Sequence, residues 1–154
     1  MSIEAGAVAS GGFQRGAKVV KNTAGSAGNH NNVPVPWDAE DYDLDSHWAS
    51  SPNPERLTIG SGYDAVILGT TVWMDNMGAT RLRTAIIVNT AFSDDAGVHY
   101  TEPNSFPDDP AQNVTTGPID VGASTDYYTV ENNSSDTSWL YVATGNFWMM
   151  VLPT

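Results

Sequence analysis

The sequence predicts an all-β fold, a sandwich of about eight to ten antiparallel strands. Two observations lead to this prediction. Short apolar runs recur at spacings of about ten residues and are separated by clusters of Gly, Pro, Asn and Asp. Apolar residues nowhere keep the i, i+3, i+4, i+7 spacing through three helical turns, so helix is expected to be minor.

Composition restricts the classes of protein to which the chain can belong. Its 154 residues are enough for one domain with one core. The chain has no Cys, which excludes disulfides and thiolate metal sites. A net charge of −12 repels phosphate backbones and anionic membrane surfaces, so neither nucleic acid nor a membrane is an expected partner. No basic segment leading into an apolar one follows Met1, so no secretory signal is expected.

Ten apolar runs are the candidate strands. In chain order they cover residues 17–21, 32–37, 56–59, 63–74, 80–89, 97–101, 114–119, 126–131, 138–143 and 146–152. Pro34 and Pro36 place the second run at a sheet edge, because proline cannot donate to the hydrogen-bond ladder. The turn Thr144-Gly145-Asn146 makes the last two runs a hairpin.

Residues 63–74 give the strongest strand signal and are expected to form a central strand. Alternation divides this run into Tyr63, Ala65, Ile67, Thr71 and Trp73 on one face and Val66, Leu68, Val72 and Met74 on the other. Both faces are apolar, so both are expected to be covered, and exposure of either would require a partner.

Two other stretches suggest surface roles. In residues 80–89, Leu82, Ile86 and Val88 alternate with Arg81 and Arg83, which predicts a half-buried strand with a basic stripe on its other face. Residues 92–113 are the longest irregular stretch, and long loops on a sandwich often carry binding sites.

The first sixteen residues predict a flexible N-terminal arm ahead of a domain over residues 17–154. The arm is mainly Gly, Ala and Ser, a composition that cannot repay the entropy of its own ordering. Either it is a frayed terminus, or it is a tether that becomes ordered on a partner. In the second case the candidate contact residues are Ile3, Val8, Phe13 and Arg15.

No catalytic motif is present. The available imidazoles are His30, His47 and His99, and none has the spacing of a zinc-protease helix or lies near a nucleophile elbow. A Ser-His-Asp triad can assemble from distant loops, but chains of this size commonly contain all three residue types. The chain is therefore not expected to be an enzyme.

A run of carboxylates raises the question of a metal. Asp38, Glu40, Asp41, Asp43 and Asp45 are closely spaced between two predicted strands, and oxygen ligands at alternate positions can hold calcium. The run lacks the Gly and the bidentate Glu that a helix-loop-helix site requires. A solvated acidic loop is the favoured interpretation, with calcium as the weaker alternative, and no cofactor is expected.

Five Trp residues in a chain of this length have three interpretations. Trp37, Trp48, Trp73, Trp139 and Trp148 can fill the core, lie between subunits or form a platform on which sugars stack. Because the strands already supply Val, Ile and Leu, some of the five are expected at a subunit interface.

Several segments stand in an order that a known family shares. The most specific is Asn53-Pro-Glu-Arg-Leu-Thr-Ile, followed by Gly60-Ser-Gly and Tyr63-Asp-Ala-Val-Ile-Leu. Arg81-Leu-Arg-Thr-Ala-Ile-Ile-Val-Asn and Asn146-Phe-Trp-Met-Met-Val-Leu follow in the same order. Together they resemble the jelly-roll family shared by the globular head of complement component q and tumour necrosis factor, in particular its tailed-phage versions. The chain departs from the family at Thr90, where Gly is usual, and in residues 120–128, which follow the pattern loosely.

The resemblance implies a jelly-roll β-sandwich that assembles as a homotrimer through aromatic and aliphatic side chains. Carried onto this sequence, the implied interface candidates are Tyr63, Trp73, Tyr127, Tyr128, Phe147 and Trp148. No collagen-like or coiled-coil stalk precedes the domain. The expected function is that of a virion surface protein: a trimeric capsid decoration or cement subunit whose arm docks on the major capsid protein or another virion protein. The alternative is the receptor-binding head of a viral spike or fibre that recognises a cell-surface glycan or protein.

Overall fold

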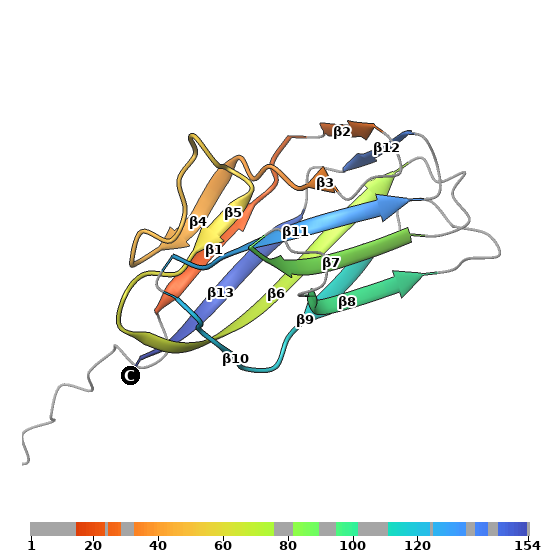
Figure 1. Cartoon of the computed structure of the whole chain (residues 1–154). Helices are drawn as coiled ribbons and strands as arrows, with labels where there is room; N and C mark the ends of the chain where they lie inside the picture. The colour runs from red at the N-terminus through yellow and green to blue at the C-terminus, as the bar shows by residue number, and fades with distance from the viewer. Residues whose placement is uncertain are drawn as a thin grey trace, which may run out of the picture.

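The computed structural model of the chain describes residues 15–23, 25–28, 33–75, 82–89, 95–101, 111–123, 125–134, 138–141 and 145–153. These residues form strands and no helix, and the strands make two sheets that pack face to face (Figure 1). The all-β sandwich that the sequence predicts is therefore confirmed. No helix in the described ranges is long and apolar enough to cross a membrane.

The two sheets differ in size. The larger has eight strands in the order β2-β12-β6-β13-β1-β4, with β9 and β10 also paired to β6, and the smaller has the order β3-β11-β7-β8, with β5 also paired to β11. The strands are β1 Gly16–Val20, β2 Gly25–Gly28, β3 Val33–Pro34, β4 Ala39–Asp43, β5 Arg56–Thr58, β6 Tyr63–Asp75, β7 Leu82–Val88, β8 Asp95–Thr101, β9 Ala111–Thr115, β10 Ile119–Asp120, β11 Tyr127–Ser134, β12 Ser138–Tyr141 and β13 Asn146–Pro153.

The core lies between the sheets and follows from the two-residue alternation of the strands. Every second side chain of β6 and β13 points inward and is buried. The buried cluster includes Val66, Leu68, Val72, Phe147, Met149 and Val151 from the larger sheet and Leu57, Ile86, Tyr128 and Val130 from the smaller. Burial of an aliphatic or Phe side chain contributes about 1.5–3 kcal/mol, so this cluster is the main source of stability.

Strand β6 is central, as residues 63–74 predict. It pairs with β13 along one edge and with β9 and β10 along the other. Its two faces differ: the side chains that face the smaller sheet are buried, whereas Ala65, Ile67 and Thr71 are half-buried and Trp73 is exposed. The expectation that both faces are covered is wrong for the single chain.

A β-bulge moves Tyr63 away from the face that simple alternation gives it. Leu152 lies opposite Ala65, but the next residue, Pro153, lies opposite Tyr63, so Asp64 is an extra residue on β6. Tyr63 consequently packs against the core cluster and against the ring of His47, with ring centroids 5.7 Å apart.

The predicted hairpin over residues 138–152 is wrong. Tyr141 at the end of β12 and Asn146 at the start of β13 both lie opposite β6 in antiparallel register. Two strands that are antiparallel to the same strand run parallel to each other, so they cannot form a hairpin. Gly145 instead extends the pairing of β13 with β1. Its carbonyl oxygen accepts a 2.8 Å hydrogen bond from the backbone N–H of Lys21.

Several element boundaries also differ from the prediction. Residues 39–43 form strand β4 on β1 and are not the solvated loop that their carboxylates suggest. Residues 114–119 belong to two strands, β9 and β10, and the irregular stretch predicted from residue 92 includes β8 and the start of β9. The edge strand predicted over residues 32–37 is reduced to Val33–Pro34, although it does lie at the edge of its sheet.

In the smaller sheet, strand β7 is buried on both faces over residues 83–87. Ile86 of β7 belongs to the core cluster, while Arg83, Ala85 and Ile87 on the other face of the same strand are also buried. The predicted basic stripe is therefore wrong at Arg83, and Arg81 lies outside the described residues.

Candidate functional site

The side of the larger sheet that points away from the core, here called the outward face, carries exposed apolar side chains. Tyr42, Leu44 and Trp73 are the exposed large hydrophobic residues of the described chain, at 41%, 57% and 38% exposure. Alternation puts Tyr42 and Trp73 on this face, and Leu44 directly follows β4. Half-buried apolar side chains from β1, β6 and β13 lie between them: Val20, Ala65, Ile67, Trp148, Met150 and Leu152. Neighbouring exposed apolar side chains are typical of interaction sites.

Trp148 lies at the centre of the outward face because of a glycine on the neighbouring strand. Trp148 is opposite Gly69 on β6 on one side and opposite Lys18 on β1 on the other. A Cβ atom at Gly69 would lie 2.2 Å from Cζ2 of the indole. The absent side chain therefore allows the indole to lie on β6, and this flattens the middle of the face.

Polar groups cross the outward face and are paired within it. The hydroxyl of Thr71 donates a 2.7 Å hydrogen bond to Oδ1 of Asn113, and Nζ of Lys18 lies 2.7 Å from a carboxylate oxygen of Asp41. These pairs leave few unsatisfied groups, so a partner that covers the face does not have to supply partners for them.

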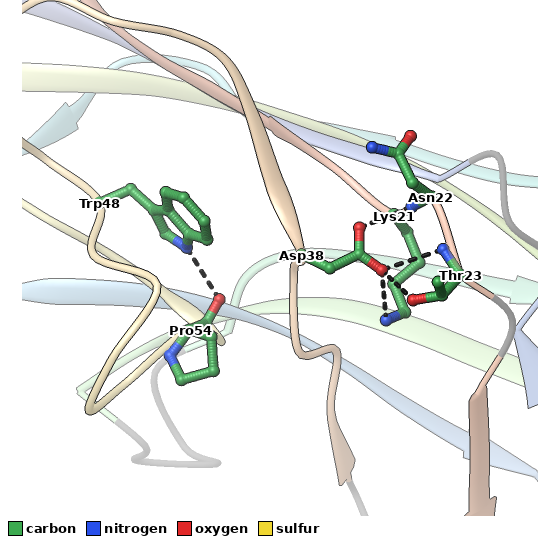
Figure 2. Close-up of polar contacts among 6 residues, drawn as sticks. All are labelled: Lys21, Asn22, Thr23, Asp38, Trp48 and Pro54. Atoms are coloured by element: carbon green, nitrogen blue, oxygen red, sulfur yellow. Dashed lines mark hydrogen bonds and ion pairs between the residues drawn. The ribbon is translucent and has the colours of Figure 1, made fainter.

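Asp38 fixes the loop after β1 against the start of β4 (Figure 2). Its carboxylate accepts hydrogen bonds from the backbone N–H groups of Asn22 and Thr23 at 2.6 and 2.9 Å, from the hydroxyl of Thr23, and from Nζ of Lys21 at 3.0 Å. Burial alone would raise the pKa of Asp38, but these donors outweigh it together and lower the pKa to about 2. The carboxylate is therefore ionised and holds this edge of the outward face in place.

The structure places only two of the six implied interface residues on the outward face, Trp73 and Trp148. Tyr63 packs against the core cluster, and Tyr127 lies on the smaller sheet with the guanidinium of Arg56 over its ring at 4.2 Å. Tyr128 and Phe147 are buried in the core, where burial and then the charge of Asp126 raise the pKa of Tyr128 to about 12. Tyr128 and Phe147 are corrections, because a side chain buried within one chain has no surface to offer a second.

Other residues of the outward face were missed from the sequence. Ile67 and Met150 follow from the alternation of their strands, but the resemblance names only aromatic positions. Tyr42 and Leu44 were missed because residues 39–43 read as an acidic loop, in which apolar side chains have no assigned direction.

The Trp residues divide among different environments. Trp37 is in the core and stacks on Phe147, with ring centroids 6.0 Å apart. Trp73 and Trp148 are on the outward face, and Trp48 is half-buried in the segment between β4 and β5. The side chain of Trp139 lies outside the described residues.

The candidate histidines and acids do not form a metal site within the described ranges. His47 is buried, with Nδ1 2.9 Å from the carbonyl oxygen of Thr58 and Nε2 3.8 Å from Asp45. Asp43 accepts hydrogen bonds from the backbone N–H groups of His47 and Trp48, both at 2.8 Å. No three His, Asp or Glu side chains of the described chain are grouped as metal ligands. His30 and the side chain of His99 lie outside this part.

Strand β1 begins at Gly16, next to the boundary predicted for the arm. Residues 1–14, with the candidates Ile3, Val8 and Phe13, lie outside the described residues, and Arg15 is exposed at the start of β1. Gly16 has φ +129°, and a Cβ atom there would lie 1.9 Å from the carbonyl oxygen of Met149. Only glycine fits at this position.

Comparison with known proteins identifies the fold. Eiger TNF from S. frugiperda matches with a TM-score of 0.59 over 91% of this chain and 92% of that chain, at 10% sequence identity. The fold is a tumour necrosis factor-like jelly roll. No protein-family model matches the sequence. No curated protein matches it either. The jelly roll that the resemblance implies is therefore confirmed as a fold.

Proposed function

We propose that this chain is a non-catalytic structural subunit that forms a homotrimer through the outward face of the larger sheet. The observation that carries the proposal is that the exposed large hydrophobic residues of the described chain border or lie on this one face. Among the described side chains the smaller sheet offers no equivalent, because those of β7 and β11 are mostly buried on both faces. The resemblance to tumour necrosis factor-like jelly rolls supports three as the number of copies.

We propose further that the trimer is a decoration or cement subunit on a virion surface, attached to the major capsid protein or another virion protein through residues 1–16. A homotrimer has the same symmetry as the threefold positions of an icosahedral shell. Gly16 and Arg15 begin β1 beside the end of β13, since the carbonyl oxygen of Arg15 accepts a 3.3 Å hydrogen bond from the backbone N–H of Val151. Arg15 therefore lies at one end of the larger sheet, next to the residues that we propose make the attachment.

Sedimentation equilibrium tests the trimer. The expected mass is about three times the 16.4 kDa of the chain. Trp73→Lys puts a charge into the proposed interface and is expected to give monomer with an unchanged circular dichroism spectrum. Thr125→Lys makes a charge change of the same sign on an exposed loop and is expected to remain trimeric. A monomeric wild-type chain, or a trimeric Trp73→Lys variant, would refute assembly through this face.

Deletion of residues 1–14 tests attachment. The deleted chain is expected to remain trimeric and to lose association with purified virus particles. Association that survives the deletion contradicts the docking role of the arm. Mass spectrometry of the particles supplies the copy number, since a decoration subunit is expected in hundreds of copies and a spike or fibre in a few.

A receptor-binding head is the second candidate. It is favoured by a pocket between β5 and the segment that precedes it, whose lining includes none of the residues of the outward face. Binding of the isolated trimer to host cells, with few copies per particle, would replace the decoration role by this one.

A further inference from the structure

The pocket beside β5 is separate from the outward face. Ser46, His47, Trp48, Ala49, Asn53, Arg56 and Thr58 line it. Leu57 of β5 points into the core, so the side chains of Arg56 and Thr58 on either side of it point away from the core. Arg56 and Thr58 come from β5 of the smaller sheet, and the other lining residues come from the segment between β4 and β5.

The walls of the pocket are held in place by hydrogen bonds. The backbone N–H of Thr58 donates to the carbonyl oxygen of His47 at 2.7 Å, and the ring of His47 is bonded back to the carbonyl of Thr58. Nε1 of Trp48 donates to the carbonyl oxygen of Pro54 at 2.9 Å, which fixes the indole (Figure 2). Because these groups are already held in place, little conformational free energy is lost in ordering them when a ligand enters.

Arg56 is held in place but keeps free donors. Nη2 donates to Oδ1 of Asn53 at 2.8 Å and lies 3.3 Å from Glu55, while the guanidinium covers the ring of Tyr127. Nη1 has no hydrogen-bond partner in the described part of the chain. Its two N–H groups can therefore donate hydrogen bonds to an oxygen of a ligand in the pocket.

The local charge selects against an anionic ligand. Glu55 compensates the charge of Arg56 at 3.3 Å, and the chain as a whole carries −12. Hydroxyls of Ser46 and Thr58, the amide of Asn53 and the indole of Trp48 add neutral polar groups and one flat apolar surface. A ring with hydroxyl groups at its rim and C–H groups on its faces matches this combination.

We propose that this pocket binds a neutral sugar ring, with the indole of Trp48 against its C–H face and Nη1 of Arg56 donating to a ring hydroxyl. The volume of the pocket, about 140 Å³, suits a single ring. The ligand is thus the end residue of a glycan. This inference does not depend on trimer formation.

Saturation-transfer NMR on the full chain tests the proposal. The probes are the methyl glycosides of glucose, galactose, mannose and N-acetylglucosamine, with glucuronate and N-acetylneuraminate as anionic counterparts. At least one neutral glycoside is expected to bind saturably with millimolar affinity and more tightly than either acid. Absence of saturable binding by all four neutral probes, or tighter binding of an acid, overturns the proposal.

Paired variants locate the binding. Arg56→Gln and Trp48→Ala are each expected to weaken binding about tenfold or more, because they remove a charged donor and the stacking surface. Lys18→Gln removes a cation and Trp73→Phe an indole from the outward face, and both variants are expected to bind as the wild type. If Trp48→Ala does not fold, Arg56→Lys is the second variant that tests the site, because it keeps the charge but loses the planar guanidinium. Wild-type affinity in Arg56→Gln and Arg56→Lys contradicts the site. Sedimentation of the same samples reports trimer formation separately.

Discussion

Replacing Asp38 by Asn tests how the edge of the larger sheet is held. The substitution keeps the shape of the side chain but removes its charge, so the hydrogen bonds from Asn22, Thr23 and Lys21 lose their ionised acceptor. It also leaves the ammonium of Lys21 buried without its carboxylate.

The size of the effect follows from the pKa. A fall from 3.8 to about 2 corresponds to an upper limit of about 2.4 kcal/mol, at about 1.36 kcal/mol per pKa unit. The side chain is 25% exposed and solvent screens it, so about 1–2 kcal/mol is the expected loss of unfolding free energy at neutral pH.

The sign of the pH dependence is fixed by the direction of the shift. The pKa is lower in the folded chain, so the contribution is fully present above the unfolded value of 3.8 and is lost as the pH falls through about 2. Urea unfolding of the wild type and of Asp38→Asn between pH 7 and pH 2 measures it. The difference in unfolding free energy is expected to be constant above about pH 5 and to shrink below pH 4.

Asp41→Asn is the matched control. Asp41 forms an ion pair with Lys18 at a similar distance, but its side chain is 53% exposed, so the expected loss is at most about 0.5 kcal/mol. Equal losses for both variants, or a loss for Asp38→Asn that does not change with pH, would refute the role assigned to Asp38.

The remaining predictions concern packing and the outward face. Gly69→Ala is expected to displace the indole of Trp148 and to weaken the trimer in sedimentation while the fold persists; an unchanged association constant contradicts the central place of Trp148. Gly16→Ala is expected to lower the thermal midpoint, because its Cβ would meet the carbonyl of Met149 at a φ that favours glycine; an unchanged midpoint contradicts the register of β1. Phe147→Ala is expected to lower the unfolding free energy by about 3–5 kcal/mol, measured in urea, and a loss below about 1 kcal/mol contradicts its core position.

Much of the fold is readable from local pattern. Alternation of apolar residues marks β6 and β13, and turn residues mark the ends of β1, β5 and β7, because these signals depend on neighbours in sequence. Which strands pair with one another cannot be read from local pattern in the same way. Thr144-Gly145-Asn146 has the composition of a hairpin turn, yet β12 and β13 follow one another along β6, since partners from elsewhere in the chain occupy both of their edges.

The outward face and the pocket also combine features that the sequence determines with features that only the tertiary structure decides. Sequence alone determined an acidic, cysteine-free, all-β domain with surplus aromatic residues and a Gly-rich start. It did not separate Trp73 on the outward face from Phe147 in the core, because both are aromatic residues in alternating strands. The tertiary structure decided this by placing the smaller sheet against one side of β6 and β13 and leaving the other side half-exposed. It also brought Arg56, Trp48 and Asn53 into one pocket, which depends on hydrogen bonds between a loop and a strand that no periodicity encodes.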